Sequence, residues 1–425
     1  MWPVSAGPGV LAFPGGSGLG GSRSVHGNLD DRRSARRALG IRWVGGLQRA
    51  MRPGPSPSRI VLCRPRGRGG VASVVDQLYP SLSTRAPTTL LPVGRRGGER
   101  LGARAIVRDG LALRRALPGA AVVHLHPSLR ARAIVRDAIL HDLAQRAGCP
   151  TVVQLHGFDR RLVAWLGARA RARAALLGSL LSADALLVLG RPFVHQLVGL
   201  GVPPERIHVV ANPFDPATIP TERIGGAPLV LYLGRLVGGK GLPELIEAIG
   251  LLSVARPRLE VVIAGEGPLE PALRSLVRAR GLSEQVRFVG WVQGAAKVEL
   301  LARASVLALV SGGEAAPVSV IEALASGVPV VATRTGAIPE LVGPAGVILD
   351  RAEPPSLAAA LTEVLDDPGR GSGGPAQVAD CTLDRITQRL IRLYRDLGAR
   401  IEDPPGVSEA PGLPEAPRRR ARVGG

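Results

Sequence analysis

The stretch Val306–Asp350 decides the fold of this chain, and it reads VLALVSGGEAAPVSVIEALASGVPVVATRTGAIPELVGPAGVILD. Val306–Val310 is an apolar run with the length of a buried strand, and glycines follow it. Pro317 favours the start of a helix, which we expect to run to about Ser326, and Val328–Ala332 is a β-branched run typical of a second strand. With a short helix and a third strand after it, the stretch predicts crossovers in a parallel sheet, whose ligands bind at the carboxyl ends of the strands.

Two carboxylates frame the loop after the first of these strands. Glu314 precedes the predicted helix, and Glu322 lies on its second turn. Because Pro317 starts the helix between them, the two side chains can reach opposite ends of one ligand. The amides of Val318 and Ser319 have no intrahelical acceptor, and the helix dipole favours an anion beside them. The arrangement fits a diphosphate with a hydroxylated ring at each end, which describes a nucleotide sugar.

The spacing of these residues resembles a known signature. Glu314-x7-Glu322 followed by Gly327-x-Pro329-Val330-Val331 is similar to the motif of glycosyltransferase family 4, a family of retaining enzymes with the GT-B fold. The resemblance extends over roughly residues 58–400 and is strongest over 229–350. It implies an α/β architecture of two Rossmann-like, doubly wound parallel-sheet domains that face a cleft.

The alternation of apolar runs and helical patterns predicts the order of domains. Helical stretches separate most of the candidate strands, which implies parallel sheets covered on both faces. The strands expected outside the opening stretch are Ile60–Cys63, Thr89–Val93, Val122–Leu125, Thr151–Leu155, Ala185–Leu189, Ile207–Val210, Leu229–Leu233, Val261–Ala264 and Val286–Val289. We expect a disordered Gly/Pro/Arg-rich leader (1–56), an acceptor-binding domain (57–220) and a hinge (221–228). After these we expect a nucleotide-sugar-binding domain (229–378), a C-terminal helix that crosses back (379–401) and a disordered tail (402–425).

Two places in the first domain are candidate ligand contacts. Gly69 and Gly70 follow the first strand and precede a helix, so their backbone amides can approach an anion. His156 ends the fourth strand, and the resemblance implies that a histidine here faces the reaction centre. His124 and His126 are weaker candidates on the acceptor side, with hydrogen-bonded turn residues as the alternative.

The second domain supplies the expected diphosphate contacts. Gly234 and Arg235 end its first strand, and Lys240 lies in the loop that follows. A departing nucleoside diphosphate develops negative charge that must be neutralised. Because no Asp-x-Asp triplet occurs in the sequence to hold a divalent metal, we expect two cations instead, and the resemblance implies Arg235 and Lys240. Gly265-Glu266-Gly267 resembles the family's segment beside the nucleotide base, and we expect neither a metal nor a cofactor.

The composition excludes several other classes of protein. A hydrophobic content of 45% is that of a globular chain, whereas an aromatic content of 3% argues against stacking platforms for single-stranded nucleic acid. Three widely separated cysteines suggest neither a disulfide framework nor a metal site, and so indicate a reducing compartment. No run has the length and apolarity of a bilayer span, since Leu176–Gly190 is broken by Asp184.

The positive charge is concentrated in the first half of the chain. Residues 1–221 contain 31 of the 54 basic residues and 11 of the 34 acidic ones, so they hold the whole net charge of +20. The predicted helix Arg160–Leu181, with Trp165, is typical of a helix on an anionic membrane surface, and a solvated helix face is an equal alternative. We expect a cytoplasmic protein, peripheral at the inner face of the cell membrane if this helix binds lipid. The only lysines are Lys240 and Lys297.

Two repeated or glycine-rich patterns carry no predicted function. Gly16-x-Gly18-x-x-Gly21 matches a dinucleotide fingerprint, but no strand precedes it and no amphipathic helix follows. The segment ARAIVRD occurs at Ala103–Asp109 and again at Ala131–Asp137, without matching flanks or a continuing period. We interpret both as chance in a chain rich in Gly, Ala and Arg.

The sequence therefore predicts a metal-independent, retaining glycosyltransferase of hexosyltransferase type, in cell-surface polysaccharide or glycolipid synthesis, with a sugar or lipid-linked acceptor. By resemblance, Glu322 binds the ribose, Glu314 binds the donor sugar, and the departing phosphate serves as base. The catalytic candidates are His156, Arg235, Lys240 and Glu314, and the donor-binding candidates are Gly69, Gly70, Gly234, Arg235, Lys240, Gly265, Glu266, Gly267, Glu314, Pro317, Val318, Ser319 and Glu322. Three alternatives stay open: a non-hydrolysing nucleotide-sugar epimerase, a catalytically silent glycan-binding relative, and a basic nucleic-acid-binding protein, for which no known module is present.

Overall fold

The computed structural model describes residues 58–67, 69–95, 102–127, 131–157 and 178–401. All of them belong to one compact unit, residues 49–425. The expectations for the leader 1–56, for residues 158–177 of the predicted basic helix and for the tail 402–425 lie outside the described residues, as does the glycine pattern at Gly16.

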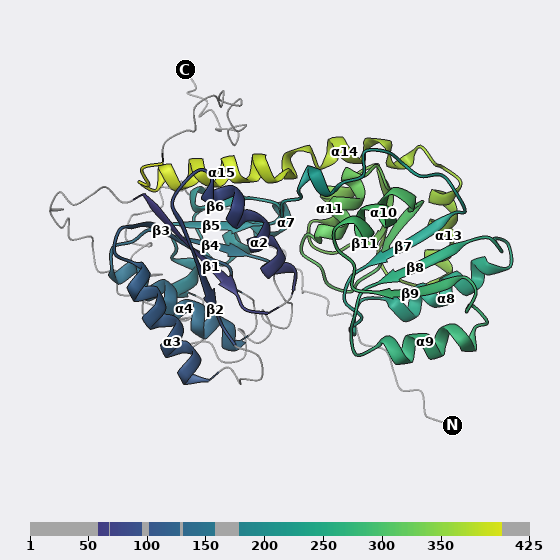
Figure 1. Ribbon diagram of the computed structural model, residues 1–425, viewed down its shortest axis with the longest axis horizontal. Helices are drawn as coiled ribbons and strands as arrows, with labels where there is room; N and C mark the ends of the chain where they lie inside the picture. Colours follow the sequence, from purple (N-terminus) through teal and green to yellow (C-terminus); the bar gives the residue numbers. More distant parts are fainter. Residues whose placement is uncertain (1–57, 68, 96–101, 128–130, 158–177, 402–425) are drawn as a thin grey trace, which may run out of the picture. The chain divides into compact units, whose positions relative to one another are not determined.

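The first half of the described chain forms a six-stranded parallel sheet in the order β2-β1-β3-β4-β5-β6 (Figure 1). Its strands are β1 Arg59–Pro65, β2 Thr88–Val93, β3 Ala120–Leu125, β4 Thr151–Leu155, β5 Ala185–Val188 and β6 Ile207–Val209. Its helices are α2 Gly70–Ser83, α3 Ala103–Ala116, α4 Ala131–Arg146 and α7 Arg191–Gly199. All six predicted strands are present, with ends that differ from the prediction by at most two residues.

The two faces of this sheet belong to different hydrophobic clusters. In β1, Val61 packs in the same cluster as Leu113 of α3, whereas Ile60 and Leu62 pack in the same cluster as Leu78 of α2. Successive residues of a strand point to opposite faces, so an uninterrupted apolar strand requires helices on both sides. The continuous apolar runs of the sequence are explained by this double coverage.

The second half forms another six-stranded parallel sheet, in the order β12-β11-β10-β7-β8-β9 (Figure 1). Its strands are β7 Leu229–Leu233, β8 Glu260–Ala264, β9 Val286–Gly290, β10 Val306–Leu309, β11 Val330–Thr333 and β12 Gly346–Leu349. Its helices are α8 Leu242–Ser253, α9 Glu270–Ala279, α10 Ala295–Arg303, α11 Val318–Ala325, α12 Ile338–Val342 and α13 Pro354–Leu365. The predicted pair of doubly wound parallel sheets is confirmed.

The opening stretch forms β10, α11, β11, α12 and β12, as predicted, with small shifts at two boundaries. Pro317 is the residue before α11, not its first helical residue, because its backbone is extended (ψ 130°). The second strand begins at Val330, not at Val328, because Gly327 has a positive φ of 66° and Val328 N bonds back to Ala323 O at 2.8 Å.

Strand order determines which loops meet. In the second sheet the chain runs outward from β7 to β9 and then returns to place β10 on the other side of β7. In the first sheet it runs from β1 to β2 and returns to place β3 on the other side of β1. The loops that leave such a switch point diverge and open a crevice at the carboxyl ends of the strands. The loops after β7 and β10 therefore border one crevice.

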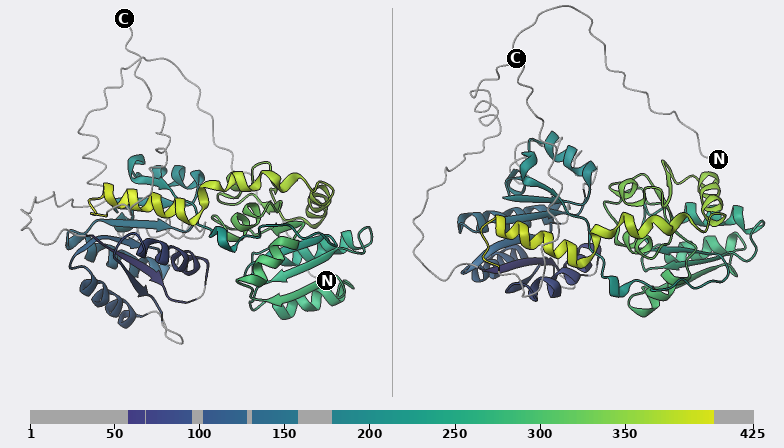
Figure 2. Two further views of the ribbon diagram at one scale, coloured as in Figure 1. Left: turned by 45° about the horizontal axis from the view of Figure 1, so that its top comes forward. Right: turned by 90° about the horizontal axis from the view of Figure 1, so that it is seen from above.

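The C-terminal helix α15, Leu383–Asp396, lies on the first sheet's side of the molecule (Figure 2). Its residues Ile386, Leu390 and Tyr394 pack in one cluster with β1 and α2. The helix is shorter than the predicted Asp380–Arg400, because extended Thr382 starts it as the N-cap and Gly398 (φ 96°) follows its end. A C-terminal helix that packs on the first domain is thus present.

Gly265 offers a test of how closely the loops of the second sheet pack. Its φ is 156°, and a Cβ on it would lie 1.8 Å from the carbonyl oxygen of Gly234. We expect Gly265→Ala to lower the free energy of unfolding by about 1–3 kcal/mol, measured by urea unfolding. Gly250→Ala in the middle of α8 is the matched control, since its Cβ would meet only Leu282 at 4.0 Å. That change should raise stability by about 0.4–1 kcal/mol, and equal effects of the two changes would contradict the packing described here.

Candidate active site

A cavity of about 650 Å³ opens at the carboxyl ends of both sheets. Loops at the switch point of the second sheet, the start of α11 and the end of β4 all contribute to its wall. Ten of the residues predicted from the sequence line it: Gly70, His156, Gly234, Arg235, Lys240, Glu314, Pro317, Val318, Ser319 and Glu322. The predicted catalytic residues thus face a common space.

Each of the two carboxylates of the motif is paired with a lysine. Lys240 Nζ lies in contact with Glu314 Oε1, and Lys297 Nζ lies 2.5 Å from Glu322 Oε1. These are the only two lysines of the whole chain. Glu322 is only 4% exposed, and a buried carboxylate needs such a partner because removal of its charge from water is costly.

The start of α11 and Arg235 give the cavity its positive end. The backbone amides of Val318 and Ser319 make no backbone hydrogen bond within the described part of the chain, whereas Val320 N and Ile321 N both bond to Pro317 O. Arg235 is exposed at the end of β7, and its carbonyl accepts a hydrogen bond from Tyr232 Oη at 3.0 Å. Both lysines are paired to carboxylates, and the lining residue Asp76 is paired to Arg64, so Arg235 is left without a carboxylate partner among the described residues. Together with the helix dipole, its charge suits an anion.

His156 lies at the cavity wall, half-buried, and is hydrogen-bonded to a second histidine behind it. His126 Nδ1 lies 3.0 Å from His156 Nε2. Burial lowers the pKa of His156 to about 4, and the nearby Asn212 side chain opposes this shift only in part. The sequence placed His124 and His126 as acceptor-side candidates, but both are fully buried, at 0% and 2% exposed, and do not line the cavity.

Four predicted donor-binding residues, Gly69, Gly265, Glu266 and Gly267, are not among those that line the cavity. Gly267 packs against the preceding loop so closely that a Cβ would lie 2.2 Å from Leu236 O, and Leu236 N donates to Glu266 O at 2.9 Å. The glycines of this segment therefore serve close backbone packing. The loop leaves β8, which lies one strand outside the switch point.

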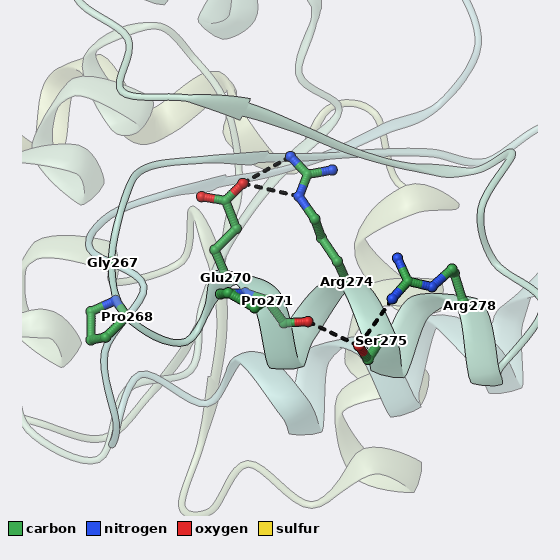
Figure 3. A pocket seen from close by; sticks show the side chains of 7 residues that line it. All are labelled: Gly267, Pro268, Glu270, Pro271, Arg274, Ser275 and Arg278. Atoms are coloured by element: carbon green, nitrogen blue, oxygen red, sulfur yellow. Dashed lines mark hydrogen bonds and ion pairs between the residues drawn. The ribbon is translucent and has the colours of Figure 1, made fainter.

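Gly267 instead borders a second, open depression of about 600 Å³ along α9 (Figure 3). Its arginines already have partners: Arg274 pairs with Glu270 at 2.8 Å, and Arg278 donates to Ser275 Oγ at 3.0 Å. Figure 3 shows these side chains directed toward one another along one face of the helix. The charge of Arg274 is thus compensated by Glu270, whereas Arg278 contacts a neutral hydroxyl.

Several lining residues were missed by sequence reasoning. Trp291 and Gln293 lie in the loop between β9 and α10, Lys297 lies on α10, and Asn212 donates from Nδ2 to Ala316 O at 2.7 Å. The signal that could have found Lys297 was its rarity, since Lys240 and Lys297 are the only lysines among 54 basic residues. Trp291 and Gln293 follow a strand end, but no spacing distinguishes them from ordinary loop residues.

Within the described ranges, no group of three or more His, Cys, Asp or Glu side chains is arranged to hold a metal ion. No helix among them has the length and apolar character to cross a bilayer. The three cysteines are free and buried, and burial raises the pKa of the Cys149 and Cys381 thiols to about 11.

The fold and the motif define a class of protein, and the comparisons with known proteins agree with it. Residues 66–218 match the family model "Glycosyltransferase Family 4", and residues 218–373 match "Glycosyl transferases group 1". The solved structure of Anabaena Alr3699/HepE in complex with UDP and glucose is similar, with a TM-score of 0.64 and 18% identity over 80% of this chain and 100% of that one. The fold is GT-B, and the chain belongs to the family 4, group 1 glycosyltransferases.

Two sequence relatives show how far the similarity reaches. The alpha-D-kanosaminyltransferase of Streptomyces kanamyceticus is 27% identical over 216 residues, 46% of this chain and 56% of that protein. The GDP-mannose-dependent monoacylated alpha-(1-6)-phosphatidylinositol monomannoside mannosyltransferase of Corynebacterium glutamicum is 34% identical over 181 residues, 40% of this chain and 47% of that protein. The chain therefore spans about half the length of these relatives.

The Lys297–Glu322 pair can be tested by its removal. Lys297→Met leaves a buried carboxylate without its cation, so we expect a loss of about 1–3 kcal/mol in the free energy of unfolding at pH 7. Lys240→Met is the matched control and should cost less, since Glu314 is more exposed.

The double variant Lys297→Met/Glu322→Gln separates pairing from packing. If the pair is responsible, the added Glu322→Gln change recovers most of the stability, because no charge is left buried. Strictly additive losses in urea unfolding would contradict the account.

Proposed function

We propose that this chain is an active glycosyltransferase that moves a hexose from a nucleotide-sugar donor to a hydroxyl group of an acceptor. The observation that carries the proposal is the meeting of Arg235, the open amides of α11 and the two lysine–glutamate pairs in one cavity. A nucleotide sugar has a diphosphate flanked by two hydroxylated rings. The cavity has cations and amides that can bind the diphosphate, and carboxylates that can bind the hydroxylated rings.

The proposed roles follow from charge and position. Arg235 and Lys240 bind the diphosphate, assisted by the amides of Val318 and Ser319. Glu322 accepts from the ribose hydroxyls with the oxygen that Lys297 leaves free. A diphosphate near Lys240 competes for its ammonium with Glu314, so donor binding frees Glu314 for the hydroxyls of the donor sugar.

The proposed reaction retains the anomeric configuration. The bond between the sugar's anomeric carbon and the diphosphate oxygen breaks, and the acceptor oxygen bonds to the same face of that carbon. The acceptor proton passes to the departing phosphate oxygen, so no nucleophile of the protein is required. Arg235 and Lys240 neutralise the charge that develops on the diphosphate, which makes a metal ion and a cofactor unnecessary.

The proposed acceptor is a sugar or a lipid-linked sugar, in cell-surface polysaccharide or glycolipid synthesis. The similarity to a mannosyltransferase named for a phosphatidylinositol mannoside supports a lipid-linked acceptor. The net charge of +20, which lies wholly in residues 1–221, supports a place on an anionic membrane surface at the cytoplasmic side.

Donor binding is tested by a thermal-shift panel of UDP-, GDP- and ADP-sugars with and without EDTA. We expect one base class to raise the unfolding midpoint by about 3 °C at saturating concentration, indifferent to chelation. Arg235→Ala should abolish the shift. Arg278→Ala on α9 is the matched arginine control and should leave it unchanged.

Two results would contradict the proposal: no shift with any nucleotide sugar, or a shift that EDTA removes. Where a donor is found, the anomeric configuration of the product, read by proton NMR, tests retention separately from donor binding.

A further inference from the structure

Four aromatic side chains form an array that runs from the cavity wall into the interior beneath α15. His126 Nδ1 lies 3.0 Å from His156 Nε2, and the rings of His124 and His126 stack with their centroids 4.2 Å apart. His124 Nδ1 lies 2.7 Å from Tyr394 Oη. The array thus joins a cavity-lining histidine to the C-terminal helix.

The array lies in a dry environment. His124 and Tyr394 are completely buried, and His126 is 2% exposed. Burial lowers the pKa of all three imidazoles: to about 3 for His124, well below the ordinary value for His126, and to about 4 for His156. The titratable groups that face one another here are the three imidazoles and the Tyr394 phenol, with the Asn212 amide beside His156, and no carboxylate of the described residues hydrogen-bonds to the rings. Burial therefore favours the neutral form of all three rings at pH 7.

The hydrogen bond between His126 and His156 has a direction that burial decides. A neutral imidazole carries one N–H and one bare nitrogen. If His156 Nε2 donated, the proton of His126 would be on Nε2, which is buried and has no partner within the described residues. A buried N–H without an acceptor is costlier and rarer than a bare acceptor. His126 therefore donates from Nδ1, and His156 Nε2 accepts.

We propose that His126 is a positioning residue: its Nδ1–H fixes His156 as the neutral Nδ1–H tautomer, so that His156 presents a hydrogen-bond donor, and not a base, to the ligand in the cavity. His124 and Tyr394 hold His126 from behind by stacking and by their hydrogen bond. With Nε2 occupied by His126, Nδ1 is the remaining polar ring atom of His156, and the Asn212 side chain and an oxygen of the ligand share it. Because α15 supplies Tyr394, the C-terminal helix belongs to the support of the site.

The inference rests on the proposed function in one respect, namely that the ligand beside His156 is the donor sugar. During transfer that sugar acquires positive charge at its anomeric centre, as in other glycosyl transfers. A neutral His156 can donate a hydrogen bond to a sugar or phosphate oxygen without placing a cation beside the positive charge of the anomeric centre. A protonated His156 would oppose the transition state.

The tautomer is measured directly, without activity, in the full chain labelled with [15N]histidine. The chain has seven histidines, and His156→Ala identifies the signals of His156 by their loss. We expect His156 to show a protonated Nδ1 and a bare, hydrogen-bonded Nε2 from pH 7 down to about pH 5. A protonated Nε2, or titration near pH 6.5, would overturn the inference whether or not a donor has been found.

Two variants of equal shape test the consequence for turnover. Asn and Leu have the same branching, but only His126→Asn keeps an N–H near the Nδ1 position. We expect His126→Asn to keep kcat within about threefold, and His126→Leu to lower kcat about tenfold or more, with the donor KM little changed in both. In His126→Leu, water reaches His156 and its pKa rises toward about 6.5, so activity should fall as the pH drops below that value, which the wild type does not show.

The outcomes separate the two claims. Equal losses in His126→Asn and His126→Leu, with unchanged pH profiles, would overturn the positioning role. A wild type that turns over no nucleotide sugar would count against the proposed function alone, since the tautomer measurement stands without it. If His126→Leu does not fold, the tautomer of the wild type and the activity of His126→Asn decide.

Discussion

The site depends on two carboxylates at the carboxyl end of the second sheet, each of which is paired with a lysine. Glu322 lies almost wholly inside the protein, and its charge is sustained by Lys297, while Glu314 is paired with Lys240. Each lysine cancels a charge and also fixes the direction of a carboxylate that a ligand can use. Substitution of either carboxylate's partner by an arginine would not reproduce this, because a compact ammonium and a planar guanidinium occupy different space.

Topology explains why these four residues meet. Lys240 follows β7, Glu314 follows β10, Glu322 lies on α11 and Lys297 lies on α10, yet β7 and β10 are neighbours at the switch point of the sheet. The same rule applied to the first sheet places the start of α2, after β1, at the cavity, as Gly70 shows. The loop after β8 lies one strand farther out, and its glycines are used in packing. A glycine-rich loop beside the switch point therefore lines the cavity, whereas a glycine-rich loop one strand farther out serves backbone packing.

Much of the fold was predictable because buried parallel strands have uninterrupted apolar sequences. Glu314, Glu322, Arg235 and Lys240 could be found because they follow strand ends or open a helix. Lys297 could not be found by spacing, because its partner lies 25 positions away and the contact exists only in three dimensions. The role of His126 was hidden for a similar reason: His124-x-His126 suggests a surface site, but His124 lies on β3 inside the sheet, His126 directly follows this strand, and both rings are buried. The basic helix predicted at Arg160–Leu181 lies mostly outside the described residues and stays a prediction.

The most direct measurement uses the fact that this chain has only two lysines. Biosynthetic labelling of the lysine side chains with 13C and 15N gives one set of NMR signals for each, and hence separate reporters for the Lys240–Glu314 and Lys297–Glu322 pairs. Titration with the nucleoside diphosphate of the best-stabilising donor should shift both sets, and inorganic pyrophosphate should shift chiefly that of Lys240. Two unmoved sets of signals, with a nucleotide sugar shown to bind by its thermal shift, would contradict the account.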